Sequence, residues 1–245
     1  MARFDPRFVR INDLRDIVDS AQAYGIKPDP AVAHGLKVHD MIHDRAVTAP
    51  TARILDLSED QAIEHTIRLA GTYASSIQGG GQSAVQFASQ RVQDQITSEL
   101  LEALAADAPR IIKGMRPTFD AAAAHLIDAT KAGITARSTA QDVLDLEDGS
   151  AAAIWNDLPG HVRTLQGIRS LRARLSTTLG IAPQDLYGLD PYVDYTACFV
   201  HPDTGITQGF IIVYPNNAAG RSDFASPLAE WLALAAAANG KMQLN

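Results

Sequence analysis

Apolar residues recur every three or four positions along most of the first 180 residues, which is the spacing of helices that bury one face. Within residues 1–50 this spacing predicts two helices, one between Asn12 and Gly25 and one from Pro30 to about Val47. Asparagine is a favoured N-cap residue, and glycine often follows the last turn of a helix. The expected inward face of the first helix comprises Ile11, Leu14, Ile17, Val18 and Ala21.

Residues 58–61, Ser-Glu-Asp-Gln, have the pattern of a capping box, in which the serine and glutamine side chains each bond the other residue's backbone N–H. They predict the start of a helix that reaches about Ile77. Three glycines at 79–81 are expected to end it, because glycine loses much conformational freedom in a helix. The expected inward residues of this helix are Ile63, Ile67, Ala70 and Ala74.

A further helix is predicted over residues 83–108, and with the preceding helix it would form an antiparallel hairpin closed by the glycine turn. Pro109 and Pro117 are expected to interrupt the helical path, and a separate helix is expected over residues 118–132, ended by Gly133. The apolar positions of the 83–108 helix have near-heptad spacing, which suits a helix–helix seam: Val85, Ala88, Val92, Ile96, Leu100, Ala103 and Leu104.

Residues 138–146 are predicted to form a short helix, and a long apolar run follows at helical spacing over residues 155–179. Pro159-Gly160 is expected to break or kink this run near its start, and Gly180 to end it. The run consists of Trp155, Leu158, Val162, Leu165, Ile168, Leu171, Leu175 and Leu179.

From Tyr187 the composition shifts to Tyr, Val, Phe, Ile, Gly and Pro, which favours strands over helices. Residues 194–200 and 206–214 are predicted strands joined by a tight turn at 202–205, and Ser226-Pro227 begins a final helix. The sequence therefore predicts a mainly α fold, with a helical hairpin or bundle and a small C-terminal β-hairpin plus helix (ββα).

This pattern divides the chain into an N-terminal helical pair (1–50), a central helical bundle (51–180) and a C-terminal ββα element (181–245), or joins all three in one domain. Hydrophobic residues make up 46% of the chain, which is enough for a packed core. The single cysteine excludes a disulfide framework and a cysteine-based zinc cluster. No apolar run is long enough for a transmembrane helix, and the charged start argues against a signal peptide. We therefore expect a cytoplasmic protein, or one incorporated in a particle assembled in the cytoplasm.

Charge is distributed in blocks around a formal net charge of −7, which argues against a surface that binds nucleic acid over its whole extent. Residues 141–160 carry five acidic and no basic residues, whereas residues 161–180 carry four basic and no acidic ones. Opposing blocks can neutralise one another within one molecule or between copies. The candidates for contacts with phosphates or with an acidic partner are Arg163, Arg169, Arg172 and Arg174.

His39 and His43 are four residues apart in a predicted helix, so both imidazoles can face the same way. His39-Asp40-Met41-Ile42-His43 resembles the H-E-x-x-H metalloprotease motif, with an aspartate in place of the glutamate. Aspartate is one methylene shorter, and no third ligand follows at a supporting spacing. The two histidines are candidate metal ligands, and no cofactor is predicted.

No motif defines an enzyme class, and the sequence favours a non-enzymatic structural or assembly protein that forms a homo-oligomer, such as a phage or prophage assembly component. Phe4 and Phe8 of the basic N-terminal arm are candidates for docking on a partner. Two alternatives stay open. One is a nucleic-acid-associated accessory protein that uses the basic residues of 163–174, and the other is an enzyme with a site near the C-terminal hairpin. The scattered candidates for such an enzyme are His39, His43, Asp194, His201 and Asp203.

Overall fold

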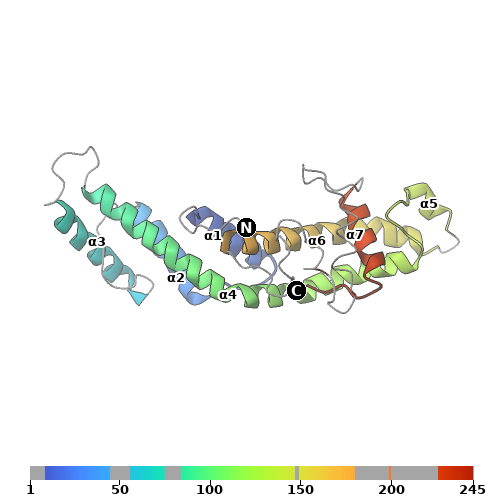
Figure 1. The fold of residues 1–245 in the computed structure, drawn as a ribbon, viewed down its shortest axis with the longest axis horizontal. Helices are drawn as coiled ribbons and strands as arrows, with labels where there is room; N and C mark the ends of the chain where they lie inside the picture. Colours follow the sequence, from blue (N-terminus) through green and yellow to red (C-terminus); the bar gives the residue numbers. More distant parts are fainter. Residues whose placement is uncertain are drawn as a thin grey trace. The chain divides into compact units, whose positions relative to one another are not determined.

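The computed structural model describes residues 9–44, 56–74, 84–146, 149–179, 199 and 226–244, with the backbone only for 43–44, 68–74 and 84–88. The chain divides into two compact units, residues 2–108 and residues 109–245, and the boundary falls inside one long helix. The described residues form the helices drawn in Figure 1: α1 (Ile11–Ala23), α2 (Pro30–Asp44), α3 (Glu59–Ala74), α4 (Ala84–Lys131), α5 (Ala140–Leu144), α6 (Ala151–Leu179) and α7 (Pro227–Ala237).

Helix α1 of the N-terminal unit buries the face that the sequence predicts. Gly25 follows the helix with a φ of 75°, a left-handed conformation that glycine adopts without strain, so the predicted stop is confirmed. The predicted N-cap is wrong, because Arg10 rather than Asn12 precedes the helix. The Asp13 carboxylate accepts a hydrogen bond from the backbone N–H of Arg10 at 2.9 Å, which allows the helix to begin earlier. The buried residues are Leu14, Ile17, Val18 and Ala21.

Helix α3 begins at the predicted capping box and packs against α2. The N–H of Ser58 donates to Oε1 of Gln61 at 2.9 Å, and the N–H of Gln61 donates to Oγ of Ser58 at 3.3 Å. Lys37 of α2 forms an ion pair with Glu59 in the first turn of α3. The capping-box prediction is therefore confirmed, and the same turn is attached to the neighbouring helix.

The predicted inward face of α3 is wrong in the part whose side chains are described. Ile63 is half-buried and Ile67 is 58% exposed, whereas Ala62 and Thr66, which were not predicted to face inward, are buried. The buried hydroxyl of Thr66 donates to the carbonyl oxygen of Ala62 one turn earlier, so it needs no partner outside the helix. Helix α3 thus buries a small and a polar side chain and leaves a large apolar one in solvent.

Helix α4 runs for 48 residues, so the predicted interruptions at Pro109 and Pro117 are wrong. A proline lacks the N–H that would bond the carbonyl four residues earlier. Both prolines are exposed, so they lie on the outer side of the helix, where water can satisfy a carbonyl that loses this bond. The predicted stop is confirmed at Gly133, which has a φ of 85°. The buried stripe is continuous past both prolines and includes Val92, Ile96, Leu100, Leu104, Ala108, Ile111, Met115, Phe119, Ala122, Leu126 and Ala129.

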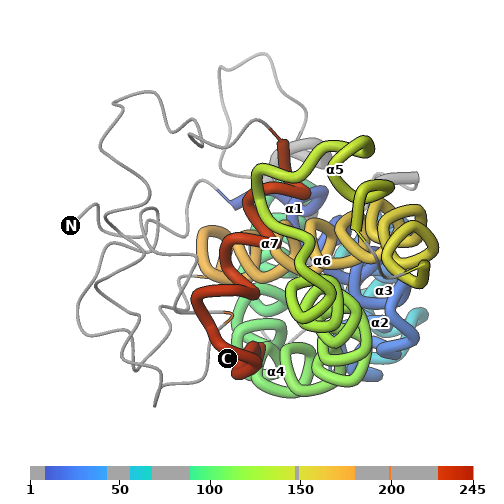
Figure 2. Tube along the Cα trace, turned by 90° about the vertical axis from the view of Figure 1, so that its right-hand side faces the viewer, coloured from blue at the N-terminus to red at the C-terminus, as the bar shows by residue number. Residues whose placement is uncertain are grey.

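In the C-terminal unit, α5 and α7 both pack on α6 (Figure 2). Helix α6 continues through Pro159, which is exposed like the prolines of α4, so a break there is wrong and the alternative, a kink, stays a prediction. The short helix α5 is capped by Thr139, whose hydroxyl accepts from the N–H of Asp142. The predicted apolar run of α6 is confirmed, and its buried members are Leu158, Val162, Leu165, Ile168, Leu171, Leu175 and Leu179.

The predicted C-terminal β-hairpin is wrong: the described residues are mainly helical and contain no strand. Of the predicted strands, only Phe199 lies among the described residues, where it adopts a bend, and the rest of 194–200 and 206–214 lies outside them. The ring of Phe199 stacks on Phe119 of α4 and meets Trp231 of α7 edge-on, with centroid distances of 5.6 Å and 5.3 Å. The apolar character of Phe199 therefore serves packing on helices.

Helix α7 is confirmed with its predicted start. Oγ of Ser226 accepts from the N–H of Ala229 at 3.2 Å, and Pro227 occupies the first turn, where a missing N–H costs nothing. The division into segments 1–50, 51–180 and 181–245 stays a prediction.

Candidate functional site

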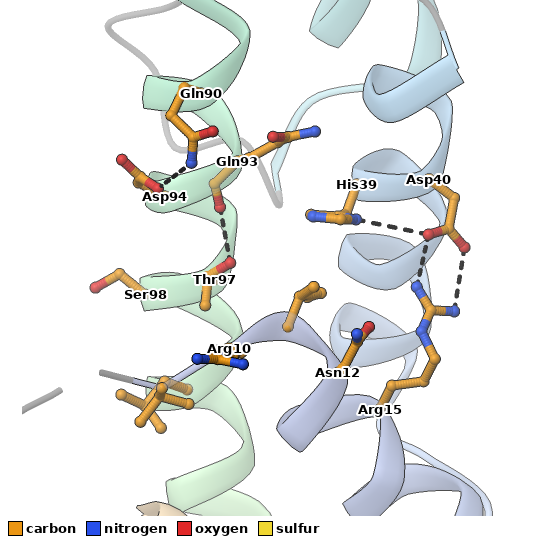
Figure 3. A pocket seen from close by; sticks show the side chains of 13 residues that line it. Arg10, Asn12, Arg15, His39, Asp40, Gln90, Gln93, Asp94, Thr97 and Ser98 are labelled. Carbon is orange, nitrogen blue, oxygen red and sulfur yellow. Dashed lines mark hydrogen bonds and ion pairs between the residues drawn. The ribbon is translucent and has the colours of Figure 1, made fainter. Parts of the chain in front are cut away.

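The N-terminal unit contains a cavity of about 800 Å³ (Figure 3). The start of α1, one face of α2 and one face of α4 form its walls. Only Val9, Ile11 and Leu101 are apolar among the residues that line it. A cavity with so many hydrogen-bonding side chains suits a polar ligand better than an apolar one. The polar lining residues are Arg10, Asn12, Arg15, His39, Asp40, Gln90, Gln93, Asp94, Thr97 and Ser98.

Arg15 of α1 and Asp40 of α2 form a two-point ion pair in the cavity wall. Nη2 of Arg15 donates to Oδ1 of Asp40 at 2.6 Å, and Nη1 donates to Oδ2 at 3.2 Å. These hydrogen bonds raise the pKa of Arg15 and lower the pKa of Asp40, because each stabilises the charged form of both partners. Nδ1 of His39 lies 3.5 Å from Oδ1 of the same carboxylate. The pair joins two walls of the cavity and neutralises one charge of each sign.

The wall formed by α4 is rich in amides and hydroxyls. Nε2 of Gln90 donates to Oδ1 of Asp94 at 2.8 Å, and the hydroxyl of Thr97 donates to the carbonyl oxygen of Gln93 at 2.8 Å. The side-chain amide of Gln93 points from α4 toward α2 (Figure 3). Each of these groups keeps a further donor or acceptor for another partner.

The structure places His39 in this cavity, with its side chain 12% exposed. The side chain of His43 lies outside the described residues, so the predicted pairing of the two imidazoles stays a prediction. Among the residues with described side chains, no three His, Cys, Asp or Glu residues gather closely enough to hold a metal ion. One neighbour of His39 in the structure is the Asp40 carboxylate.

The four arginines proposed as a basic face lie on α6 in different environments. Arg169 forms an ion pair with Glu230 of α7, and its guanidinium carbon lies 5.9 Å from the centre of a Trp231 ring. Arg172 is buried and donates to Oγ of Ser176 at 2.7 Å. Arg163 is exposed and Arg174 is half-buried. Two of the four thus lie at internal contacts of the C-terminal unit, and their assignment to a phosphate or a partner stays a prediction.

The other residues selected from the sequence lie outside the described part of the chain. These are Phe4, Phe8, Asp194, His201 and Asp203. Their roles as docking or catalytic residues stay predictions.

A stacked pair of histidines joins α4 to α6 in the C-terminal unit. The rings of His125 and His161 lie 3.8 Å apart between centroids, with an angle of 15° between their planes. Burial lowers the pKa of His161, and so does the nearby His125, while Asp157 acts in the opposite direction. Asp128, which is bonded to Lys131, also lies within electrostatic range of His125. No local sequence pattern predicts this pair, because the two histidines belong to separate helices.

We expect this pair to make the C-terminal unit less stable in acid. A histidine whose pKa is lowered on folding binds its proton more readily in the unfolded chain, so stability falls as the pH drops below about 6.5, the unfolded value. In urea titrations followed by tryptophan fluorescence, His161→Gln should lose less stability than the parent protein between neutral and mildly acidic pH. An equal loss in both proteins would show that His161 does not carry the effect.

Comparison with protein-family models, with curated proteins and with solved structures gives no match to this chain. None of the described helices is both long and apolar enough to span a membrane.

Proposed function

We propose that this chain is a non-enzymatic structural protein that self-associates, with α3 at the contact between copies. The observation that carries the proposal is Ile67, which is 58% exposed on a helix that buries the polar Thr66. Amphipathic helices usually turn their large apolar residues inward. In α3 the polar Thr66 faces inward and the large apolar Ile67 faces outward, which favours a partner that covers Ile67.

A second copy of the chain is the partner that fits this face. Full burial of an isoleucine side chain stabilises a contact by about 1.5–3 kcal/mol. A two-fold symmetric contact places the same residue on both sides, so a single apolar side chain contributes twice. The capping box and the ion pair between Lys37 and Glu59 fix the start of α3 on α2. Helix α3 therefore holds Ile67 in a fixed position, where another molecule can contact it.

The test compares two substitutions of the same chemistry on different helices. Ile67 and Leu144 are the large apolar residues that stand exposed among those described, at 58% and 66%. Ile67→Glu should weaken self-association by about two orders of magnitude, because a symmetric contact loses apolar burial and gains a buried charge on both sides. Leu144→Glu on α5 is the matched control and should leave the assembly unchanged.

Light scattering during size-exclusion chromatography measures the mass of each variant. Loss of the assembly in Ile67→Glu but not in Leu144→Glu supports the proposal. If both variants assemble like the parent protein, α3 does not form the contact between copies. If only Leu144→Glu loses the assembly, α5 forms the contact instead.

A further inference from the structure

The charges that line the cavity of the N-terminal unit are not all paired with one another. Arg15 and Asp40 neutralise each other through two hydrogen bonds. Arg10 and Asp94 line the same cavity, yet neither side chain forms an ion pair with any residue that the structure describes. One positive and one negative group therefore face the cavity without direct contact between them.

We propose that this cavity binds a small zwitterionic ligand of the amino-acid or short-peptide class. Its carboxylate would lie against the guanidinium of Arg10, and its ammonium group against the carboxylate of Asp94. Arginine offers a planar fork of N–H donors that matches a carboxylate. The Asp94 carboxylate has one oxygen engaged by Gln90, and its other oxygen keeps its acceptor sites.

The uncharged lining also fits a peptide-like ligand. The side chains of Asn12, Gln93 and Ser98 make no hydrogen bond to other described residues. A side-chain amide presents one acceptor and two donors, so it can bond both the N–H and the carbonyl of a peptide group. Asn12 and Gln93 lie on α1 and α4, so a ligand between them would be bonded from two walls (Figure 3).

Two further properties of the lining limit the class of ligand. His39 is the one aromatic residue of the lining, which lacks Phe, Tyr and Trp, the larger rings on which nucleobases usually stack. The volume of about 800 Å³ lies in the range of small-molecule sites. The lining contributes no net charge apart from His39, which fits a ligand that carries both signs.

Three simple probes separate the contributions of the two charges. Glycylglycine carries both charged groups, N-acetylglycine lacks the ammonium group, and glycinamide lacks the carboxylate. In chemical-shift titrations of the full chain at low salt, glycylglycine should bind with a dissociation constant below about 1 mM. N-acetylglycine and glycinamide should each bind about tenfold more weakly, because each loses one charge-assisted hydrogen bond. The side-chain amide signals of Asn12 and Gln93 should shift on binding.

Substitutions in the protein should mirror the changes in the ligand. Arg10→Gln and Asp94→Asn should each weaken glycylglycine binding about tenfold. Arg10→Gln should leave the affinity for glycinamide unchanged, and Asp94→Asn should leave that for N-acetylglycine unchanged. Asp60→Asn on α3 is the control and should bind like the parent protein. Arg10, Asp60 and Asp94 are exposed, so these changes should not prevent folding, which circular dichroism verifies.

Three results would overturn the proposal. Glycylglycine could fail to bind at millimolar concentration. N-acetylglycine could bind as tightly as glycylglycine, which would define a site for anions only. Arg10→Gln and Asp94→Asn could bind glycylglycine like the parent protein. The comparison of ligands on the unmodified chain keeps the test decisive even where a variant does not fold.

Discussion

Trp231→Ala is expected to destabilise the C-terminal unit by about 3–5 kcal/mol, the usual cost of truncating a large aromatic residue in a core. Trp231 is 1% exposed on α7. Its ring meets Phe119 of α4 and Phe199 edge-on, at centroid distances of 6.4 Å and 5.3 Å. Alanine leaves a void among these rings and removes the aromatic surface over which Arg169 lies.

The loss is measured by urea unfolding followed by the fluorescence of Trp155, the other tryptophan of the chain, which lies on α6 of the same unit. Trp231→Phe is the control. It should cost less than alanine, because most of the ring is retained and the indole N–H has no acceptor among the described residues. If Trp231→Ala lowers the free energy of unfolding no more than Trp231→Phe does, the packing of Trp231 against Phe119 and Phe199 does not contribute this stability.

Glu230→Ala is expected to destabilise the same unit by about 3 kcal/mol, because removal of one partner leaves a poorly hydrated charge behind. Glu230 is 7% exposed and forms an ion pair with Arg169, whose side chain is 27% exposed. Arg172 is 3% exposed on the same helix as Arg169, so loss of the carboxylate also raises the net positive charge near a buried guanidinium.

Two controls test whether burial is the cause. Asp128→Ala breaks an exposed pair with Lys131 and should have little effect, because exposed ion pairs contribute little. The double variant Arg169→Met, Glu230→Leu should recover part of the loss, because it removes both charges together. Equal effects of Glu230→Ala and Asp128→Ala in urea unfolding would show that the pair with Arg169 behaves as a surface pair.

The features that could be predicted from the sequence are local ones. Ser58 and Gln61 are three residues apart and bond each other's backbone, so their capping box depends on no distant part of the chain. Gly25 and Gly133 end their helices because each adopts a positive φ. The buried run of α6 follows from helical spacing within a single segment.

The features that the sequence predicts wrongly depend on which face of a helix is buried. Pro109, Pro117 and Pro159 lie on exposed faces, where a lost backbone hydrogen bond can be replaced by water, and the sequence does not give this orientation. Helical spacing places Ile67 on the inner face of α3, but Thr66 satisfies its hydroxyl within the helix and is buried, while Ile67 is exposed.

The candidate site could be predicted only in part for a related reason. His39 was selected for its spacing from His43, and the structure places it in the cavity next to Asp40. Arg10 and Asp94 lie on segments far apart in the sequence, and neither belongs to a motif. Their common cavity arises from the packing of helices. The arginines of α6 are close in sequence and therefore look like one basic group. They lie on different faces of the helix, so their burial differs.

The mass of the native particle tests the central proposal most directly. The chain has a mass of 26.2 kDa. Sedimentation equilibrium over a range of protein concentrations should give a mass that rises above this value to a whole multiple of it, because the proposed contact covers Ile67 of α3 with a second copy. A mass that stays at 26.2 kDa up to tens of micromolar would contradict self-association.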